Sequence, residues 1–573
     1  MLRLTASSCA LAAALVPPSA AQCNDSFVQS ALVHPRAGTP FSIARAGNDV
    51  LHLGDEIILA SASTTTPGAS NRDGAVLTYE RSGSGWTRTG VLTIPSPGSG
   101  GEQQFGDALA SAGDVLVITA SGRALGMPPG VLPTGAAFTY RRVGSTWNVD
   151  PTFLTSPTPS RDDLYGNAVA TNGAWIAVGA RLDSTTLLEA GAVHLYEDTP
   201  SGWQFRQTLT SPSPLANAQF GTSVAMTDDV LAVGEPRAGS GRVEIYRLTA
   251  GAWSHAEELA SQVPGSNENF GVSVDLDQGP QELVLAVGAP ASPPAFQGAV
   301  VLYETFGGGQ SLLFSERFDA PFPVQTDRLG CSIAVDGDVV VSGACFNSPS
   351  GVSAGGAHVF RRTDPFTWEC DDLLFPSEAR ASAAVGSAVD VEGGEIVVCG
   401  TGFQFNGQAN GGCWTFERMP EGARLFGFGD GATDPCPCGN ETATVLQQGC
   451  ENLSGVGGSL FPNGTLGLGA DDLELDVRNL NGANLTILFS GTGVLAPAQT
   501  IGNGLNFCLP PLRRLGVESS DAFGIATFGP GLVAASGWSV GQTLTLQAWY
   551  RDPNAACVST FNATGGVELT ILP

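Results

Sequence analysis

The residues best suited to metal chemistry in this sequence are three closely spaced carboxylates. Asp275 and Asp277 flank one apolar residue, and Glu282 follows five positions after Asp277. Calcium takes about six to eight oxygen ligands, which proteins supply from closely spaced carboxylates and carbonyl groups. Asp275, Asp277 and Glu282 are therefore the candidate metal ligands, but the segment offers no further alternating acid. We predict that the protein needs no cofactor, with calcium at these three residues as the alternative.

The sequence offers few residues at spacings that suit catalysis. None of the five histidines stands at a zinc-ligand spacing or beside a nucleophile elbow. His194 and His358 lie in corresponding strand segments but at different offsets from the Gly-Ala steps before them, so we do not expect a matched pair. The acidic pairs Asp162-Asp163 and Asp371-Asp372 are expected in loops. We predict no catalytic residue, and the alternative is a pair of carboxylates brought together from distant loops.

The cysteines favour disulfides over catalysis or metal binding. The motif Cys436-Pro437-Cys438 matches neither a redox CxxC site nor half of a zinc ribbon, because no second matching pair follows it. We assign it to a disulfide framework that includes Cys450. Four further cysteines flank or lie in neighbouring predicted strands, where disulfides would be structural: Cys331, Cys345, Cys399 and Cys413.

A repeated unit carries most of these residues and fills about the first 420 positions. Each unit opens with an aromatic residue followed by glycine, and weaker copies have a small or aliphatic residue before the glycine. Seven such steps follow one another at intervals of 50 to 60 residues: Ala46-Gly47, Phe105-Gly106, Tyr165-Gly166, Phe220-Gly221, Phe270-Gly271, Leu329-Gly330 and Val385-Gly386. Regular self-similarity of this kind indicates a repeat architecture.

Each unit predicts four strands. A short segment after the step ends at a tight turn such as Gly113-Asp114, which suits a two-residue hairpin. The next strand, as in residues 115–118, is apolar without alternation and must be covered on both faces. A third strand ends in an aromatic residue, as residues 136–140 do, and a fourth begins near a tryptophan such as Trp147. One four-stranded sheet per unit, apolar on both sides, predicts the blades of a β-propeller.

The ends of the array predict a closed ring rather than a linear solenoid. Residues 27–35 match the fourth strand of the other units, whereas the last unit stops after a third strand at residues 413–417. The first segment is therefore expected to pair with residues 413–417 and to supply the missing outer strand, which leaves no open edge at the end of the array.

The units resemble FG-GAP repeats, which occur in the N-terminal propeller of integrin α subunits and in many bacterial secreted proteins. The resemblance rests on Phe270-Gly271, on Val287-Gly288-Ala289-Pro290 and on the sevenfold recurrence, and it covers about residues 24 to 418. It implies a seven-bladed β-propeller and extracellular recognition. The calcium loop of the family has a third acidic position and one residue more than residues 275–282, and the other six units have only a tight turn there.

The repeat ends near residue 420, and the amino-acid composition changes after it. Glycine, cysteine and asparagine cluster first, and strands with period-two alternation follow at residues 473–477, 485–489, 543–550 and 567–572. We predict a propeller over residues 22–420 and a small β-sandwich-like domain over residues 421–573. This domain resembles C-terminal modules of bacterial secreted repeat proteins.

The N-terminus and the charge indicate where the protein acts. Residues 1–21 have the positive start, apolar run and small-residue cleavage site of a secretory signal peptide. No later segment has the roughly 18 apolar residues of a transmembrane helix. The net charge of −28 argues against nucleic acid and anionic membranes as partners. We expect a secreted, extracellular or cell-surface protein.

These features favour a non-enzymatic binding or adhesion protein with a protein or glycan ligand. The alternatives are a glycan-acting lyase or hydrolase with its site on the propeller axis, and a structural surface-layer component. A propeller without a dedicated site binds through loops on one face. The longest connections are expected to project from one face and to offer a polar surface: residues 64–73, 123–134, 181–189 and 346–354.

Overall fold

The computed structural model describes most of the chain. The described residues are 27–33, 46–63, 73–82, 85–94, 104–122, 134–160, 162–263, 265–279, 282–293, 297–306, 309–320, 327–346, 353–376, 381–405, 408–426, 435–437, 448–450, 452, 457–467, 471–478, 480, 485–501, 503–520, 524–552 and 560–573. The predicted signal peptide, residues 1–21, lies outside them. Within this part the protein is all-β apart from one short helix, α1 (Leu532–Ser536), and contains no helix that could serve as a membrane span.

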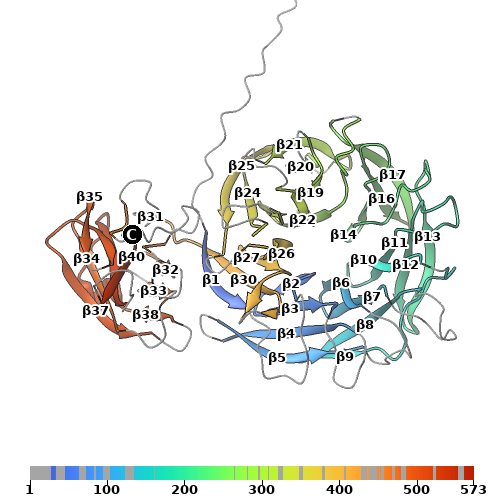
Figure 1. Cartoon of the computed structure of the whole chain (residues 1–573). Helices are drawn as coiled ribbons and strands as arrows, with labels where there is room; N and C mark the ends of the chain where they lie inside the picture. The colour runs from blue at the N-terminus through green and yellow to red at the C-terminus, as the bar shows by residue number, and fades with distance from the viewer. Residues whose placement is uncertain are drawn as a thin grey trace, which may run out of the picture.

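Four-stranded antiparallel sheets form the repeated units and are arranged in a ring, a propeller-like architecture (Figure 1). The described residues contain seven of them, numbered here as sheets 1 to 7, each with its first strand nearest the centre. Sheet 1 contains β2 (Val50–Leu53), β3 (Glu56–Ser61), β4 (Ala75–Ser82) and β5 (Gly85–Leu92). Sheet 2 contains β6 (Phe105–Ala112), β7 (Val115–Ala120), β8 (Ala136–Val143) and β9 (Thr146–Val149). Sheet 3 contains β10 (Tyr165–Thr171), β11 (Trp175–Ala180), β12 (Ala192–Thr199) and β13 (Gly202–Leu209).

The remaining sheets repeat this order. Sheet 4 contains β14 (Val224–Met226), β15 (Val230–Glu235), β16 (Arg242–Thr249) and β17 (Ala252–Ala260). Sheet 5 contains β18 (Val274–Gln278), β19 (Leu283–Gly288), β20 (Ala299–Glu304) and β21 (Leu313–Asp319). Sheet 6 contains β22 (Leu329–Asp336), β23 (Val339–Ala344), β24 (Ala357–Asp364) and β25 (Thr367–Leu374). Sheet 7 is β26 (Val385–Glu392), β27 (Glu395–Gly400), β30 (Gly412–Arg418) and β1 (Phe27–Val33). A small hairpin, β28 (Gln404–Phe405) and β29 (Gln408–Ala409), interrupts the connection from β27 to β30.

Burial explains the apolar runs of the sequence. All six residues of β7 and of β11 are buried, because each sheet is covered on both faces by its neighbours. Among the described residues, seven hydrophobic clusters each join two consecutive sheets, and one of them joins sheet 7 to sheet 1. The core of the ring is therefore distributed around its circumference, and every sheet depends on two neighbours for its burial.

Single parallel bridges also connect neighbouring sheets. In each of them a glycine shortly before a third strand pairs with the residue that directly precedes the step glycine of the next sheet, as Gly74 does with Phe105, and Gly411 with Ala46 joins sheet 7 to sheet 1 in the same way. Gly74 has a φ of 84°, and a Cβ added there would lie 2.1 Å from the Phe105 carbonyl oxygen. Only glycine permits this approach. The described bridges of this kind are Gly74–Phe105, Gly135–Tyr165, Gly191–Phe220, Gly241–Phe270, Gly298–Leu329, Gly355–Val385 and Ala46–Gly411.

The predicted closure of the array is confirmed. β1 pairs antiparallel with β30, with Phe27 opposite Arg418 and Val33 opposite Cys413. The backbone N–H of Phe27 also donates to Asp372 of sheet 6 at 2.5 Å. The N-terminal segment thus supplies the outer strand of the last sheet, as its match to the fourth-strand pattern indicated.

This connectivity creates two different rims. The tight turns that join first to second strands and third to fourth strands lie on one rim, which we call the hairpin rim. The connections from second to third strands, and from one sheet to the next, leave from the opposite rim, which we call the loop rim. The four long connections predicted from the sequence all join second to third strands, and of these only residues 181–189 are described throughout.

The sheets of the C-terminal region share no strand with the ring. One sheet contains β31 (Ala423–Phe426), β40 (Phe561–Thr570), β39 (Thr543–Arg551), β34 (Leu485–Gly491) and β37 (Arg513–Ser519). A second contains β32 (Ser459–Asn463), β33 (Glu474–Arg478) and β38 (Ala526–Phe528), and a hairpin contains β35 (Val494–Ile501) and β36 (Gly504–Cys508). The first two sheets share one hydrophobic core. Arg478 of β33 donates to the Gln29 carbonyl in β1, which connects this region to the closing strand.

The cysteine interpretation is confirmed for three pairs. The structure contains the disulfides Cys331–Cys345, Cys399–Cys413 and Cys436–Cys450. Cys370 is also disulfide-bonded. Disulfides persist in oxidising compartments, so these bonds support an address outside the cytoplasm. Among the described cysteines, Cys508 is a free thiol, and burial raises its pKa to about 12.

Candidate functional site

The first strand of each sheet is an edge strand, and its outer backbone groups need partners. Unpaired N–H and C=O groups in a buried position are costly. The ring satisfies them with side chains from the neighbouring sheet. Serine and asparagine side chains donate to carbonyl oxygens, and aspartate side chains accept from N–H groups. The residues that line the axis are therefore determined first by this requirement.

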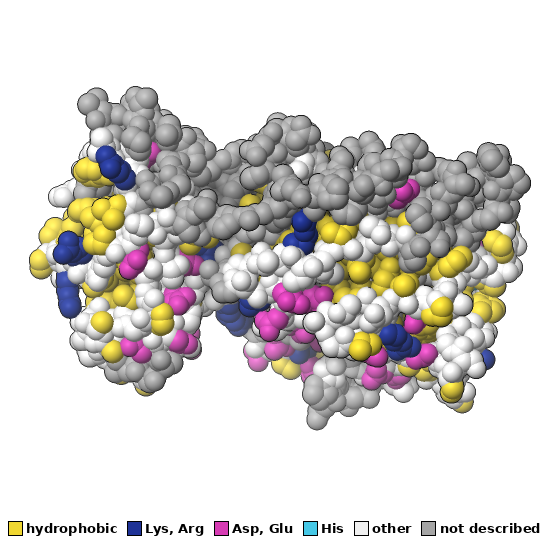
Figure 2. Space-filling model, turned by 90° about the horizontal axis from the view of Figure 1, so that it is seen from below, with side chains coloured by type: hydrophobic (Ala, Val, Ile, Leu, Met, Phe, Trp, Pro, Cys, Tyr) yellow, Lys and Arg dark blue, Asp and Glu magenta, His cyan; other side chains and the backbone are white. Residues whose placement is uncertain are grey.

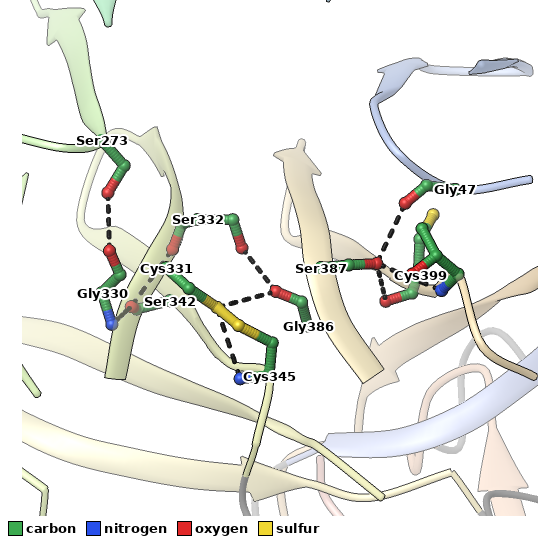
Figure 3. The surroundings of a disulfide bond; sticks show 11 residues. Gly47, Ser273, Gly330, Cys331, Ser332, Ser342, Cys345, Gly386, Ser387 and Cys399 are labelled. Carbon is green, nitrogen blue, oxygen red and sulfur yellow. Dashed lines mark hydrogen bonds between the residues drawn. A yellow bond between two sulfur atoms is a disulfide. The ribbon is translucent and has the colours of Figure 1, made fainter. Parts of the chain in front are cut away.

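The donors form a belt at the glycine that opens each sheet. Figure 3 shows three of these contacts, in which a serine hydroxyl points at the glycine carbonyl of the next sheet. The described contacts are Asn48 to Gly106 at 2.6 Å, Asn167 to Gly221 at 3.0 Å, Ser223 to Gly271 at 2.9 Å, Ser273 to Gly330 at 2.8 Å, Ser332 to Gly386 at 2.9 Å and Ser387 to Gly47 at 3.0 Å. The last contact joins sheet 7 to sheet 1.

The boundary between sheets 2 and 3 departs from this pattern. Asp107 stands directly after Gly106, where sheets 1 and 3 have Asn48 and Asn167. An ionised carboxylate has no hydrogen to donate, and Asp107 instead accepts from the Ser121 hydroxyl. Burial raises the pKa of Asp107, whereas the Ser121 hydrogen bond and the positive charge of Arg181 lower it. The belt thus carries a titratable group at this one described boundary.

The acceptors form a second set of contacts along the first strands. Each aspartate accepts from a backbone N–H of the next sheet. The described contacts are Leu109 to Asp49 at 2.7 Å, His52 to Asp390 at 2.6 Å, Val335 to Asp275 at 2.8 Å, Gly337 to Asp277 at 2.9 Å and Gly393 to Asp336 at 2.7 Å. These carboxylates accept the backbone hydrogen bonds that a further paired strand would otherwise accept at the edge.

Their burial alters their acidity. Burial raises the pKa of Asp49 and of Asp275 to about 7, against the lowering effect of their backbone hydrogen bonds. Burial also raises the pKa of Asp390 well above its ordinary value, and the negative charges of Asp275 and Asp49 add to the increase. The three acids come from sheets 1, 5 and 7, so they interact electrostatically across the ring. At neutral pH the axis therefore carries carboxyl groups that are partly protonated.

The three predicted calcium ligands are used in these protein contacts. Asp275 and Asp277 lie within β18 and not in the turn that follows, and each accepts from a different backbone N–H of sheet 6. Glu282, just before β19, accepts from the guanidinium of Arg362. The part of the chain that the structure describes contains no group of three or more histidine, cysteine or acidic residues suited to a metal ion. Calcium binding stays a prediction without geometric support.

The prediction that His194 and His358 stand at unmatched positions is wrong. His194 lies opposite Val178 and His358 lies opposite Ser342, each directly before the glycine of its second strand. Both stand two residues before the aromatic residue of the third strand, so they are equivalent positions and not mismatched ones. The extra glycine before Ala357 obscured the register in the sequence. Both rings are buried, and burial lowers the pKa of each to about 4. They are core residues of sheets 3 and 6.

The acidic pair Asp162-Asp163 lies in a loop as predicted, whereas the prediction is wrong for Asp371-Asp372. Asp371 and Asp372 lie in β25 and are buried, and Asp371 pairs with Arg361 at 3.3 Å. Asp163 is buried as well, and its pKa rises to about 6 because of burial. Adjacent acids break the apolar pattern that marks a strand, so the strand position of Asp371 and Asp372 has no local signal, and their partners come from other strands. Asp163 instead accepts from the nearby backbone N–H of Ser160 at 2.8 Å.

The hairpin rim carries repeated contacts between charged and aromatic side chains. An acid of one sheet accepts from a tryptophan and an arginine of the next. Glu56 accepts from Trp147 at 3.0 Å and pairs with Arg142, and Glu304 accepts from Trp368 at 2.7 Å and pairs with Arg362. Acidic residues also stand at the turns of this rim, and Figure 2 shows acidic side chains gathered toward the lower edge of the ring. Such turn residues include Asp55, Asp114, Asp229 and Asp338.

The loop rim holds one connection that is described from end to end. In residues 181–189, Asp183 is 1% exposed and its Oδ1 accepts from the backbone N–H of Thr185 at 2.8 Å. The hydroxyl of Ser184 accepts from the N–H of Glu189 at 2.9 Å. These hydrogen bonds support the conformation of the connection.

The same connection is fastened to its neighbour and exposes apolar side chains. The N–H of Asn217, between sheets 3 and 4, donates to the Leu188 carbonyl at 2.7 Å. Leu187 is 43% exposed, Leu188 is 64% exposed and Leu215 is 50% exposed. We call these three residues the leucine platform. In the one long connection that is fully described, Leu187 and Leu188 add an apolar part to a surface that also exposes Ser184, Thr185 and Thr186.

Comparison with known proteins gives no family. No protein-family model matches the chain, and no curated protein matches it. One similar solved structure is that of a 6-phosphogluconolactonase-like protein from Bacteroides uniformis, at 12% sequence identity and a TM-score of 0.39. The match covers 60% of this chain and 89% of that one. No activity is inferred from it.

Proposed function

We propose that the protein is a secreted or cell-surface binding protein that recognises an extracellular protein or glycan through the loop rim of a seven-bladed FG-GAP-type β-propeller. Four lines of support converge on this proposal. They are the signal-peptide pattern of residues 1–21, the disulfides, the sevenfold FG-GAP-like repeat, and the closing strand that joins the last sheet to the first. The C-terminal region is proposed as a β-sandwich-like module attached to this propeller.

The leucine platform is the observation that carries the binding role. Hydrogen bonds within one connection, and between it and its neighbour, support its backbone, and it presents three leucine side chains to solvent. Apolar side chains gathered on a preorganised loop offer area that a partner can bury without an ordering cost in the protein. Burial of each leucine by a partner would contribute roughly 1.5 to 3 kcal/mol. The carboxylates of the axis, in contrast, are engaged by backbone N–H groups in ways that explain their presence.

A binding screen tests the proposal. The secreted chain is immobilised and screened against a glycan array and a panel of extracellular proteins. For any ligand found, the triple variant Leu187→Ser, Leu188→Ser, Leu215→Ser should weaken binding by at least about tenfold, which corresponds to about 1.4 kcal/mol. Val143→Ser is the matched control, because Val143 is 68% exposed but lies on the hairpin rim. Equal binding by the triple variant, or turnover of a bound glycan, would overturn the proposal.

A further inference from the structure

Two phenylalanine rings meet on the hairpin rim at the boundary of sheets 5 and 6. Phe306 follows β20 and is 67% exposed, and Phe366 lies in the turn between β24 and β25. Their ring centroids are 6.1 Å apart, and the ring planes are inclined by 41°. We call them the aromatic pair. The pair is far from the leucine platform, which lies on the opposite rim.

The backbone at Phe366 is unfavourable for a bulky residue. Asp364 pairs with Thr367, so Pro365 and Phe366 form a two-residue turn, and Phe366 has a φ of 59°. A positive φ at the second turn position normally requires glycine. The corresponding turn of sheet 4 has Gly251 there, with a φ of 79°. A strained residue of this kind persists where something other than local stability favours it, and such residues cluster at ligand sites.

A charged cluster with more acidic than basic groups contacts the backbone of Phe366. Arg362 pairs with three carboxylates, those of Glu282, Glu304 and Asp338. Burial alone would lower the pKa of Arg362, but hydrogen bonds with Asp338 and Glu304 raise it, so this guanidinium stays charged and is fully engaged. The backbone N–H of Phe366 faces Glu304 at 3.4 Å. Three carboxylates against one guanidinium leave an excess of negative charge in this cluster, which contacts the backbone of Phe366 through Glu304.

We propose that the aromatic pair is a second binding site, which takes a cationic group such as the guanidinium or ammonium of a basic peptide segment. The faces of aromatic rings carry a negative quadrupole and attract cations at distances of about 6 Å. The surplus carboxylate charge adds to this attraction and steers basic partners, and the net charge of −28 extends the effect over the whole surface. This proposal is independent of the ligand of the loop rim.

A pair of peptides and a pair of variants test it. Fluorescein-labelled hexa-arginine is titrated with the full secreted chain, and hexa-citrulline, which has the same shape without the charge, is the peptide control. Phe306→Ser and Phe366→Gly leave the net charge unchanged, and each should weaken binding of hexa-arginine by about tenfold. Val143→Ser, at an equally exposed position of the same rim, should have no effect. Phe366→Gly should leave the melting temperature equal or higher, because it relieves the strained φ.

Three results would overturn the proposal. Equal binding of hexa-arginine by all variants would assign its affinity to the general negative charge. Displacement of the peptide by a neutral oligosaccharide would make the pair a glycan site instead. A lower melting temperature for Phe366→Gly, with unchanged peptide binding, would show that the aromatic pair serves packing only.

Discussion

The boundary between sheets 7 and 1 and the boundary between sheets 2 and 3 solve one structural problem in different ways. At the first, Ser387 donates to the Gly47 carbonyl, Asp390 accepts from the His52 N–H, and the adjoining sheet carries a disulfide. At the second, Asp107 occupies the donor position but accepts a hydrogen bond from the Ser121 hydroxyl. The closing boundary thus has a neutral donor and a carboxyl acceptor that both contact the next sheet, whereas the acid at the donor position of the other boundary contacts a hydroxyl of its own sheet.

The difference shows that equivalent backbone geometry does not require equivalent chemistry. Both boundaries keep the same glycine bridge and a hydrophobic cluster between the sheets. The apolar clusters supply most of the burial, so a less favourable polar contact is tolerated at one point of the ring. Changes at the two boundaries should therefore differ in size and in their dependence on pH.

The largest effect is expected from removal of the closing strand. Deletion of residues 22–36 removes β1, which buries Phe27 and Val33 and pairs with β30. It exposes the edge of β30 and part of two hydrophobic clusters, so the ring should lose cooperative unfolding or most of its stability. Thermal unfolding followed by circular dichroism measures this, with the chain that begins at residue 22 as the control. A deletion variant that melts like the control would contradict the role of β1.

The next effect concerns the disulfide beside the same boundary. Cys399→Ser with Cys413→Ser opens a crosslink whose partners are 14 residues apart in the sequence. The expected loss is about 2 to 4 kcal/mol in the free energy of unfolding. Denaturant titration of the secreted chain measures it, and Cys436→Ser with Cys450→Ser, which opens a crosslink of equal span in the C-terminal region, is the matched comparison. An unchanged ring transition in the first variant would refute the expectation.

Exchanges of single side chains in the belt should have effects of opposite sign at the boundary of sheets 2 and 3 and at the boundary of sheets 3 and 4. Asp107→Asn restores the donor that Asn48 and Asn167 provide in the adjacent sheets, so it should stabilise the protein by about 1 kcal/mol at pH 8. Asn167→Asp removes such a donor from the Gly221 carbonyl and should destabilise it by about 1 to 3 kcal/mol. Chemical unfolding at pH 8 measures both. The same sign for the two exchanges would show that the belt does not act as described.

The buried acids of the axis predict a pH dependence. Asp49 and Asp275 have a pKa of about 7 in the folded protein, raised from 3.8 by burial. Between these values the folded protein holds protons that the unfolded chain has released, so the free energy of unfolding falls as pH rises from about 4 to about 7. These two carboxyls should contribute at least about 1 kcal/mol less stability at pH 8 than at pH 5, whereas the buried neutral rings of His194 and His358 act in the opposite direction between their folded-state pKa of about 4 and the ordinary 6.5.

Asn variants sharpen this prediction. Asp49→Asn or Asp275→Asn removes the titrating group, and the slope of stability against pH should become flatter, even though the amide replaces one accepting oxygen and lowers stability at pH 5. Melting temperatures at a series of pH values measure the slope. A slope in either variant that falls more steeply with pH than that of the parent protein would contradict the assignment.

The smallest effect is expected from calcium. The carboxylates of Asp275 and Asp277 already accept backbone N–H groups, and Glu282 pairs with Arg362. Millimolar calcium should therefore change the melting temperature very little. Tight binding would stabilise the protein by about 4 kcal/mol at a thousandfold excess over Kd. A shift of that size that Asp275→Ala abolishes would restore the calcium interpretation.

Much of the architecture could be predicted from the sequence because it depends on local or periodic sequence patterns. The double-sided apolar runs predicted the buried second strands, as in residues 115–118 within β7. The match of residues 27–35 to a fourth-strand pattern predicted the pairing of β1 with β30, since a strand that completes a unit must repeat its pattern. The cysteine positions in neighbouring strands pointed to two of the disulfides for the same reason.

The character of the candidate sites was decided only by the tertiary structure. The partners of Asp49, Asp275 and Asp390 are backbone groups of the next sheet, roughly a full repeat away along the chain or at its opposite end, so no spacing in the sequence announces them. The equivalence of His194 and His358 required the strand register, because one inserted glycine shifts the local pattern. Likewise, Phe366 is recognisable as strained only from its φ, and Phe306 joins it only because two sheets meet at that rim. Local sequence determines which residues form strands, whereas edge pairing, burial and charge environment arise when strands distant in the chain become neighbours.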